Sequence, residues 1–233
     1  PKIENKEIEI IHNPESYGYG FSANEGIQRL KGENIFILMN SDIFVTPNWL
    51  NEITKSFEMN PQLGLIFPST SWGAFEGSLY HAQENRLNWK EEDILKFAIK
   101  VKDLFHNKIY IWHHANGFCW ATRSKIFNTL GFFDEQFSPG YSEETDMNMR
   151  IKRLGLLIGH ARGIYCHHRG SQSMAVEELI NPQLNTNTLR LKCDQRFKQK
   201  WANPNQIPMF QPKYPIEKVK EFINLNTDSK WVY

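Results

Sequence analysis

The chain has 233 residues, of which 40% are hydrophobic, so it can bury a substantial core as one domain. Lysine and arginine total 27 against 26 aspartates and glutamates, and this balance argues against a nucleic-acid partner. The longest apolar runs have the length of a strand, so the sequence shows no membrane span.

The N-terminal part of the chain predicts a strand, a turn, a helix and a second strand. Residues 8–11 have the composition of a strand, and a glycine-rich turn at residues 17–20 leads into a helix over residues 23–30. The apolar run at residues 34–39 has the length of a buried strand and ends directly before Asn40-Ser41-Asp42.

Asp42 therefore stands at the carboxyl end of a buried strand, where open α/β sheets bind their ligands. Thr46, as N-cap, and Pro47, at the first helical position, then mark a helix start, and apolar spacing carries that helix to Asn60. An aspartate at a strand end can also simply form a turn, and the residues alone leave both roles open.

The segment 69–111 follows another buried strand expected at residues 63–67. It carries aromatic residues, including Trp72, and a helix with apolar residues at helical spacing from Ile94 to Phe105. This helix can pack on the sheet as an ordinary amphipathic helix. Alternatively, the segment can form a lid over an acceptor, since loops carry specificity and aromatic rings stack on sugars.

Three acidic residues, Glu143, Glu144 and Asp146, fall in the first turn of a predicted helix that stops at Gly155. Acidic side chains are common at a helix N-terminus because the helix dipole favours negative charge there. A charged helix start is the simpler interpretation, and a catalytic role depends on the other polar sites.

A histidine pair, His167-His168, ends the apolar stretch that follows this helix. One carboxylate and one imidazole can hold a divalent cation if a phosphate supplies further oxygens, which connects the pair with Asp42. Adjacent strand residues point to opposite faces, so at most one of the two histidines faces a given site. A histidine pair alone is more often structural.

Strands that alternate with helices predict an α/β fold with a mainly parallel sheet covered on both faces. The core is expected to span residues 1–173, with 69–111 as an insertion, and residues 174–233 to form an extension packed on it. Three cysteines without metal-site spacing suit a reducing compartment, so a cytoplasmic location is expected, with peripheral membrane attachment left open.

Several motifs follow one another in a recognisable order. They are Asn13-Pro14-Glu15 with Gly18 to Ile27, Asn40-x-Asp42, Asn116 to Arg123, Gly131 to Phe137, Glu143-Glu144-x-Asp146 with Arg150, and His167-x-x-Gly170-Ser171. In their order and spacing the chain resembles a family 2 glycosyltransferase, the inverting class with the GT-A fold, near its rhamnosyltransferase-like branch. The resemblance covers residues 8–173, and Phe197-x-x-Lys200-Trp201 is similar to a common ending of the family.

The resemblance implies a metal-dependent, non-processive transfer of a sugar from a nucleotide-sugar donor to a glycan, glycolipid or protein acceptor. Asp42 and His167 would hold Mn²⁺ or Mg²⁺ at the donor diphosphate. Glu144 matches the catalytic base, Glu143 would assist at the acceptor, and Asp146 would hold the helix start or the site geometry. The remaining expected contacts are Asn24, Asn40, Asp42 and Gly117 for the donor and Trp72, Trp120 and Tyr141 for the acceptor.

Two features depart from the family pattern. Glu143-Glu144 stands where the family often has Glu-Asp, and the strand, helix and strand that grip the nucleotide base have no counterpart before Ile8. The chain is therefore interpreted as a fragment, a processed chain or a domain whose remainder lies elsewhere.

Two alternative functions remain open. One is a non-catalytic sugar- or nucleotide-binding module derived from the same fold. The other is a metal-dependent phosphoesterase, suggested by Asp42 together with the His113-His114 and His167-His168 pairs, which would need several ligands around two metals.

Overall fold

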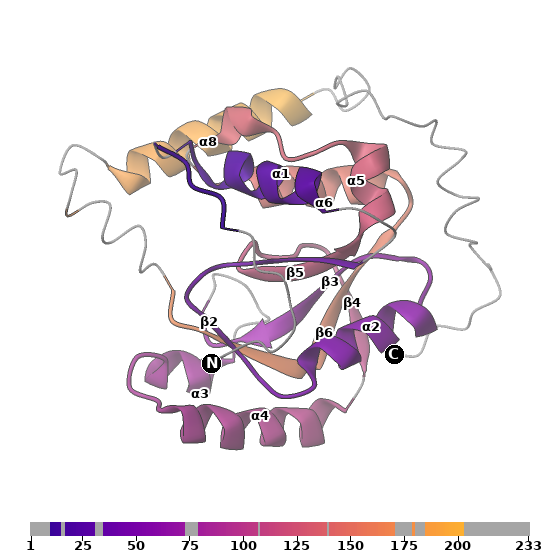
Figure 1. Cartoon of the computed structure of the whole chain (residues 1–233), viewed down its shortest axis with the longest axis vertical. Helices are drawn as coiled ribbons and strands as arrows, with labels where there is room; N and C mark the ends of the chain where they lie inside the picture. The colour runs from indigo at the N-terminus through magenta and orange to yellow at the C-terminus, as the bar shows by residue number, and fades with distance from the viewer. Residues whose placement is uncertain are drawn as a thin grey trace.

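The computed structural model describes residues 10–14, 17–30, 35–72, 79–106, 108–138, 140–170, 179 and 185–202, so most of the strand expected at residues 8–11 lies outside it. One sheet lies between two groups of helices (Figure 1). The first group is α1 (Tyr19–Arg29), α5 (Ser124–Leu130), α6 (Glu143–Arg153) and α8 (Thr186–Trp201). The second group is α2 (Trp49–Met59), α3 (Tyr80–Asn85) and α4 (Glu91–Phe105).

The described residues form a six-stranded sheet in the order β1-β5-β3-β6-β2, with β4 also paired to β6. The strands are β1 (Ile35–Met39), β2 (Ile43–Val45), β3 (Leu63–Thr70), β4 (Ile109–Trp112), β5 (Cys119–Arg123) and β6 (Leu157–His168). Among them β3 and β6 pair in parallel, and the other pairings are antiparallel.

The α/β architecture was expected, but the expected mainly parallel sheet is present only in part. Strand β5 inserts between β1 and β3 and runs opposite to both, so these two strands share a direction without being neighbours. Strands β2 and β4 likewise run opposite to β6. Hydrophobic periodicity shows where strands are, whereas their direction depends on which neighbour each one pairs with.

The two faces of the sheet bury separate apolar clusters. Beneath the first helix group, Phe36, Leu65 and Trp120 pack with Phe127 and Ile151. On the opposite face, a second cluster joins α2 to the sheet through residues that include Ile53, Phe57 and Ile66. Alternate residues of β1, β3 and β5 thus face opposite layers, which is the period of a strand.

Helix α4 is the packed amphipathic helix of the simpler interpretation. Its Ile94 and Val101 are buried and pack with Tyr165 of β6, while Leu104 on the other side is exposed. Within the described residues, no helix combines the length and hydropathy needed to cross a bilayer.

Two helix boundaries show how local signals compete with tertiary contacts. Helix α2 begins at Trp49 instead of Pro47, because Asn48 is left-handed and the Thr46 hydroxyl donates to the Tyr165 carbonyl at 2.7 Å instead of capping the helix. Helix α6 ends as predicted, with Leu154 as C-cap and Gly155 at φ 73°.

Strand β6 organises the region of interest because it has neighbours on both edges. It pairs with β3 along one edge and with β4 and then β2 along the other. Its register with β3 shifts between Pro68 and Ser69, so that residues 162–164 are extra on β6. The end of β6, with both histidines, therefore lies beside β2 and the turn that precedes it.

Candidate active site

A carboxylate and an imidazole meet where β1 ends and β6 ends. Ile43 pairs with His168, which places the Asp42 side chain next to that histidine, with Asp42 Oδ1 3.3 Å from His168 Nε2. The Asp42 carbonyl accepts a hydrogen bond from the Arg169 amide at 3.2 Å. The Asp42 and His168 side chains are only 14% and 8% exposed, so the pair is largely shielded from bulk water.

The hydrogen bonds of His168 indicate its tautomer. Its Nδ1 lies 3.2 Å from the Trp72 carbonyl, which can only accept, so the proton belongs on Nδ1 and Nε2 carries the lone pair. Burial lowers the pKa of His168 below 6.5, although Asp42 opposes this, so the ring is neutral at neutral pH. A lone pair and a carboxylate oxygen thus face each other.

His167 lies on the opposite face of β6, and its predicted role as a metal ligand is wrong. Its Nδ1 bonds with the Tyr165 hydroxyl at 2.8 Å and its Nε2 with the Arg86 carbonyl at 2.8 Å. The ring also stacks on Trp89, with centroids 6.0 Å apart. Strand alternation gives one histidine to each face, and the face towards Asp42 belongs to His168.

The turn formed by Gly117 and Phe118 connects this pair with the acidic helix start. The Phe118 ring stacks on His168 with centroids 5.4 Å apart, and its carbonyl accepts from the Asn40 amide at 2.8 Å. On the other side, a Cβ atom on Gly117 would lie 3.4 Å from Cβ and Cγ of Glu144. One short turn therefore stacks on the histidine and passes close to the glutamate.

The start of α6 has an unusual backbone. Tyr141 and Ser142 both have positive φ angles, 78° and 71°, which non-glycine residues adopt rarely and which are found at functional sites. The Ser142 hydroxyl donates to Asp194 of α8 at 3.1 Å, which helps to hold this conformation. Glu143 and Glu144 follow directly, so this backbone conformation fixes where the first turn of α6 begins.

Both glutamates lie in an environment that opposes ionisation. Glu143 is buried, its Oε2 has no hydrogen-bond partner among the described residues, and burial raises its pKa to about 8 with a further contribution from the Glu144 charge. Burial likewise raises the pKa of Glu144, while Arg190 opposes the rise. At neutral pH Glu143 therefore holds a proton beside Glu144.

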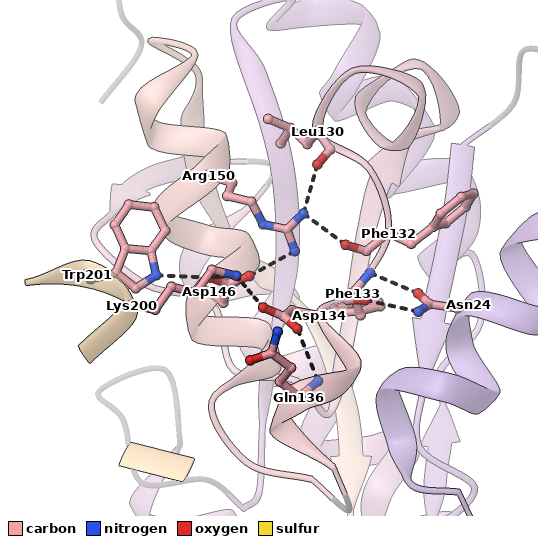
Figure 2. A network of polar contacts seen from close by, with 10 residues as sticks. All are labelled: Asn24, Leu130, Phe132, Phe133, Asp134, Gln136, Asp146, Arg150, Lys200 and Trp201. Carbon is pink, nitrogen blue, oxygen red and sulfur yellow. Dashed lines mark hydrogen bonds and ion pairs between the residues drawn. The ribbon is translucent and has the colours of Figure 1, made fainter. Parts of the chain in front are cut away.

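Asp146 belongs to a polar network between α6 and α8 (Figure 2). It is fully buried, pairs with Arg150 at 2.9 Å, and accepts from Trp201 Nε1 at 2.9 Å. Lys200 bridges Asp146 at 2.8 Å and Asp134 at 2.6 Å. With these contacts Asp146 connects the start of α6 to α8.

Two other predicted contacts are wrong because the side chains are already occupied or buried. Asn24 exchanges hydrogen bonds with the Phe133 backbone at 2.8 and 3.0 Å (Figure 2). It also donates to Glu135 at 2.8 Å, so it holds a loop and cannot contact a donor. Trp120 is 1% exposed and packs against Phe127 and Phe133 in the core, out of reach of an acceptor.

The remaining predicted residues lie around the Gly117–Phe118 turn or the two sites that it joins. The side-chain amide nitrogen of Asn40 is 3.5 Å from His168 Nε2. Tyr141 stands two residues before the acidic pair. The Trp72 ring covers Gly170, where a Cβ atom would come within 1.9 Å of the ring, and lies under the guanidinium of Arg86.

The described residues contain no cluster of three or more histidine, cysteine, aspartate or glutamate side chains that could hold a metal. His113 is exposed, and His114 bonds with Asn148 of α6 at 3.1 Å, so this pair does not join Asp42. A site with two metals, which a phosphoesterase would need, therefore has no support here.

Three residues of the site were missed by sequence reasoning. The sequence does not show that β6 contains extra residues, and these change which side chains face each side of the sheet. With that information His168 could have been predicted to face Asp42. Phe118 lies within the motif from Asn116 to Arg123, but nothing in the sequence indicates that its ring stacks on an imidazole. Arg86 has no local signal, since its contacts are far away in the sequence.

Two comparisons with known proteins found similarities to this chain. The Glycosyl transferase family 2 model matches residues 2–131, more than half of the 233-residue chain, and ends before the acidic pair. A crystal structure of GalNAc-T7 with UDP, GalNAc and Mn²⁺ is similar, with a TM-score of 0.48 and 15% identity. The similarity covers 67% of this chain and 31% of that one, so this chain spans about a third of that protein. None of the curated proteins matches the chain.

Proposed function

Because the chain belongs to glycosyltransferase family 2, we propose that it is a metal-dependent, inverting and non-processive glycosyltransferase. Its substrates would be a nucleotide-sugar donor and a glycan, glycolipid or protein acceptor. The observation that supports this best is the Gly117–Phe118 turn, which stacks on His168 on one side and passes close to Glu144 on the other. The proposed cation-binding pair and the proposed base would thus be parts of one site.

Asp42 and His168 fit a divalent cation. A carboxylate and a neutral imidazole that donates its other N–H to a carbonyl form a common ligand set. The 3.3 Å between Asp42 Oδ1 and His168 Nε2 would allow both atoms to bind the same cation. When bound, Mn²⁺ or Mg²⁺ would neutralise the charge that grows on the leaving diphosphate.

Glu144 is the proposed general base. The acceptor hydroxyl would transfer its proton to the Glu144 carboxylate as its oxygen attacks the anomeric carbon from the face opposite the diphosphate. The bond between the sugar and the diphosphate breaks in the same step, so the anomeric configuration inverts. A carboxylate whose pKa is raised by burial is a better proton acceptor near neutral pH than an exposed one.

The test is the Glu144→Gln variant, which preserves size but removes the proton acceptor. Release of nucleoside diphosphate from a panel of nucleotide-sugars, with Mn²⁺ and added sugar acceptors, should fall by about 100-fold or more. Donor affinity measured by calorimetry should stay within a few-fold of the parent. Glu58→Gln, an exposed glutamate on α2, is the matched control and should behave as the parent.

Turnover by Glu144→Gln at the parental rate would contradict this role of the residue. Binding of a nucleotide-sugar by the parent without any transfer across the panel would favour the non-catalytic binding module instead.

A further inference from the structure

Arg86, which directly follows α3, lies beside the cation-binding pair. Its guanidinium is 4.1 Å from the centre of the Trp72 ring, and its Nε donates to the Arg169 carbonyl at 3.1 Å. Both contacted residues hold the pair as well: the Trp72 carbonyl accepts from His168 and the Arg169 amide donates to Asp42. Arg86 is thus connected to the pair through two independent routes.

The backbone of Arg86 is fixed at the same place, because its carbonyl accepts from Nε2 of His167 at 2.8 Å. The side chain is half-buried, and among the described residues its terminal nitrogens have no hydrogen-bond acceptor. They remain able to donate to a ligand.

We propose that Arg86 binds the diphosphate of the nucleotide-sugar donor, as a second cationic group beside Asp42 and His168. This proposal rests on the proposed function of the site. The guanidinium fork matches phosphate oxygens, and stacking on Trp72 together with the Nε bond limits the rotamers that must be ordered on binding.

The charge balance of the site supports this role. A divalent cation held by one carboxylate and one neutral imidazole leaves a single net positive charge, whereas the diphosphate of a donor carries about two negative charges. Arg86 supplies the missing positive charge. Since the leaving diphosphate gains further negative charge as the sugar departs, the same residue would stabilise the product side of the reaction.

A purely structural role for Arg86 makes a different prediction, and the chain offers a matched control. Arg162 of β6 also stacks on aromatic rings, 4.2 Å from the centre of Phe105 and 5.0 Å from that of Tyr110. It lies six residues before His168, within the bulged part of β6. Replacing either arginine by glutamine removes one positive charge together with its cation–π contacts, one for Arg86 and two for Arg162.

The experiment measures binding of inorganic pyrophosphate in the presence of Mn²⁺ by calorimetry, for the parent, Arg86→Gln, Arg86→Lys and Arg162→Gln. Loss of a charge-assisted hydrogen bond should weaken pyrophosphate binding by about tenfold or more in Arg86→Gln. Arg86→Lys should recover part of the affinity because it restores the charge. Affinity for Mn²⁺ alone should stay unchanged in Arg86→Gln, and Arg162→Gln should bind pyrophosphate like the parent.

Equal pyrophosphate affinity in Arg86→Gln and the parent would overturn the inference, and so would an equal loss in Arg162→Gln. Neither result would affect the roles of Asp42, His168 and Glu144. If the parent itself does not bind pyrophosphate with Mn²⁺, the cation site of the proposed function fails first, and the assignment of Arg86 fails with it.

Discussion

At the scale of the residue, burial sets the protonation of the acidic pair. Glu143 and Glu144 are adjacent at the start of α6, and each carboxylate is desolvated, so two full charges in this place would be costly. A proton on Glu143 removes one of them. Glu144 can then remain the ionised member, which its proposed role as general base requires.

The stability of the protein should reveal this proton. The pKa of Glu143 is raised from 4.5 to about 8, so between these values the folded chain holds a proton that the unfolded chain has released. Stability contributed by this group is therefore present below pH 4.5 and lost as the pH rises through 8. Glu143→Gln, which cannot ionise, should escape this loss and exceed the parent by more than about 1 kcal/mol at pH 9.

Urea unfolding at pH 5 and pH 9 measures the effect, with Glu58→Gln on the exposed side of α2 as the control. If Glu143→Gln gains nothing between the two pH values, Glu143 is ionised in the folded protein and the account of the acidic pair is incorrect.

At the scale of the element, α8 holds the acidic helix start against the core. Cys193 donates to the Gly140 carbonyl at 3.2 Å, Asp194 accepts from Ser142, and Lys200 and Trp201 contact Asp146. These residues recur at helical spacing along one side of α8, facing the segment that leads into α6 (Figures 1 and 2). A helix with little apolar burial of its own is therefore fixed by polar contacts.

Lys200→Met should destabilise the protein because it leaves Asp134 without its charged partner and Asp146 with Arg150 and Trp201 as its remaining partners among the described residues. Breaking a buried ion pair costs about 3 kcal/mol, and the Lys200 side chain is only 17% exposed. Lys198→Met, an exposed lysine on the same helix, should change stability by less than about 0.5 kcal/mol. Denaturant unfolding of both variants tests this, and equal stabilities would show that α8 does not depend on this network.

Elements with strong local signals were predictable from the sequence. The strand before Asp42, the amphipathic α4, and the start and stop of α6 depend on periodicity and capping, which a short window contains. The phase of β6 and the burial of Trp120 and Asn24 depend on residues far away in the chain. For that reason sequence reasoning could select the carboxylates as candidates, but it could not decide which of the two histidines faces Asp42.

At the scale of the whole molecule, the candidate site is assembled from segments that the sheet brings together. Asp42 precedes β2, the Gly117–Phe118 turn precedes β5, Glu144 lies in the first turn of α6 and His168 ends β6. A ligand that contacts several of these segments joins them in the folded state alone, so its binding energy adds to the stability of the entire fold.

A nucleoside diphosphate with Mn²⁺ should therefore raise the melting temperature of the parent by about 5–10 °C at a hundredfold excess over Kd. His168→Ala should lose this shift, because it removes a proposed ligand of the cation. His167→Ala should keep it, even if its own melting temperature falls through the loss of its contacts with Tyr165 and Arg86. Differential scanning calorimetry gives both values, and the reverse pattern would return the metal ligand to His167.

The position of β6 has a consequence for how the chain acquires its structure. Strands β2 and β4 pair with no described strand other than β6. Because Ile43 pairs with His168, β2 can form its hydrogen bonds only after residue 168 has been synthesised. During synthesis the earlier strands would thus leave the ribosome with unpaired edges, and loop closure across most of the chain would precede the main gain in contacts. The nascent chain would be most prone to aggregate in that interval, until the strand that carries His168 arrives and closes the sheet.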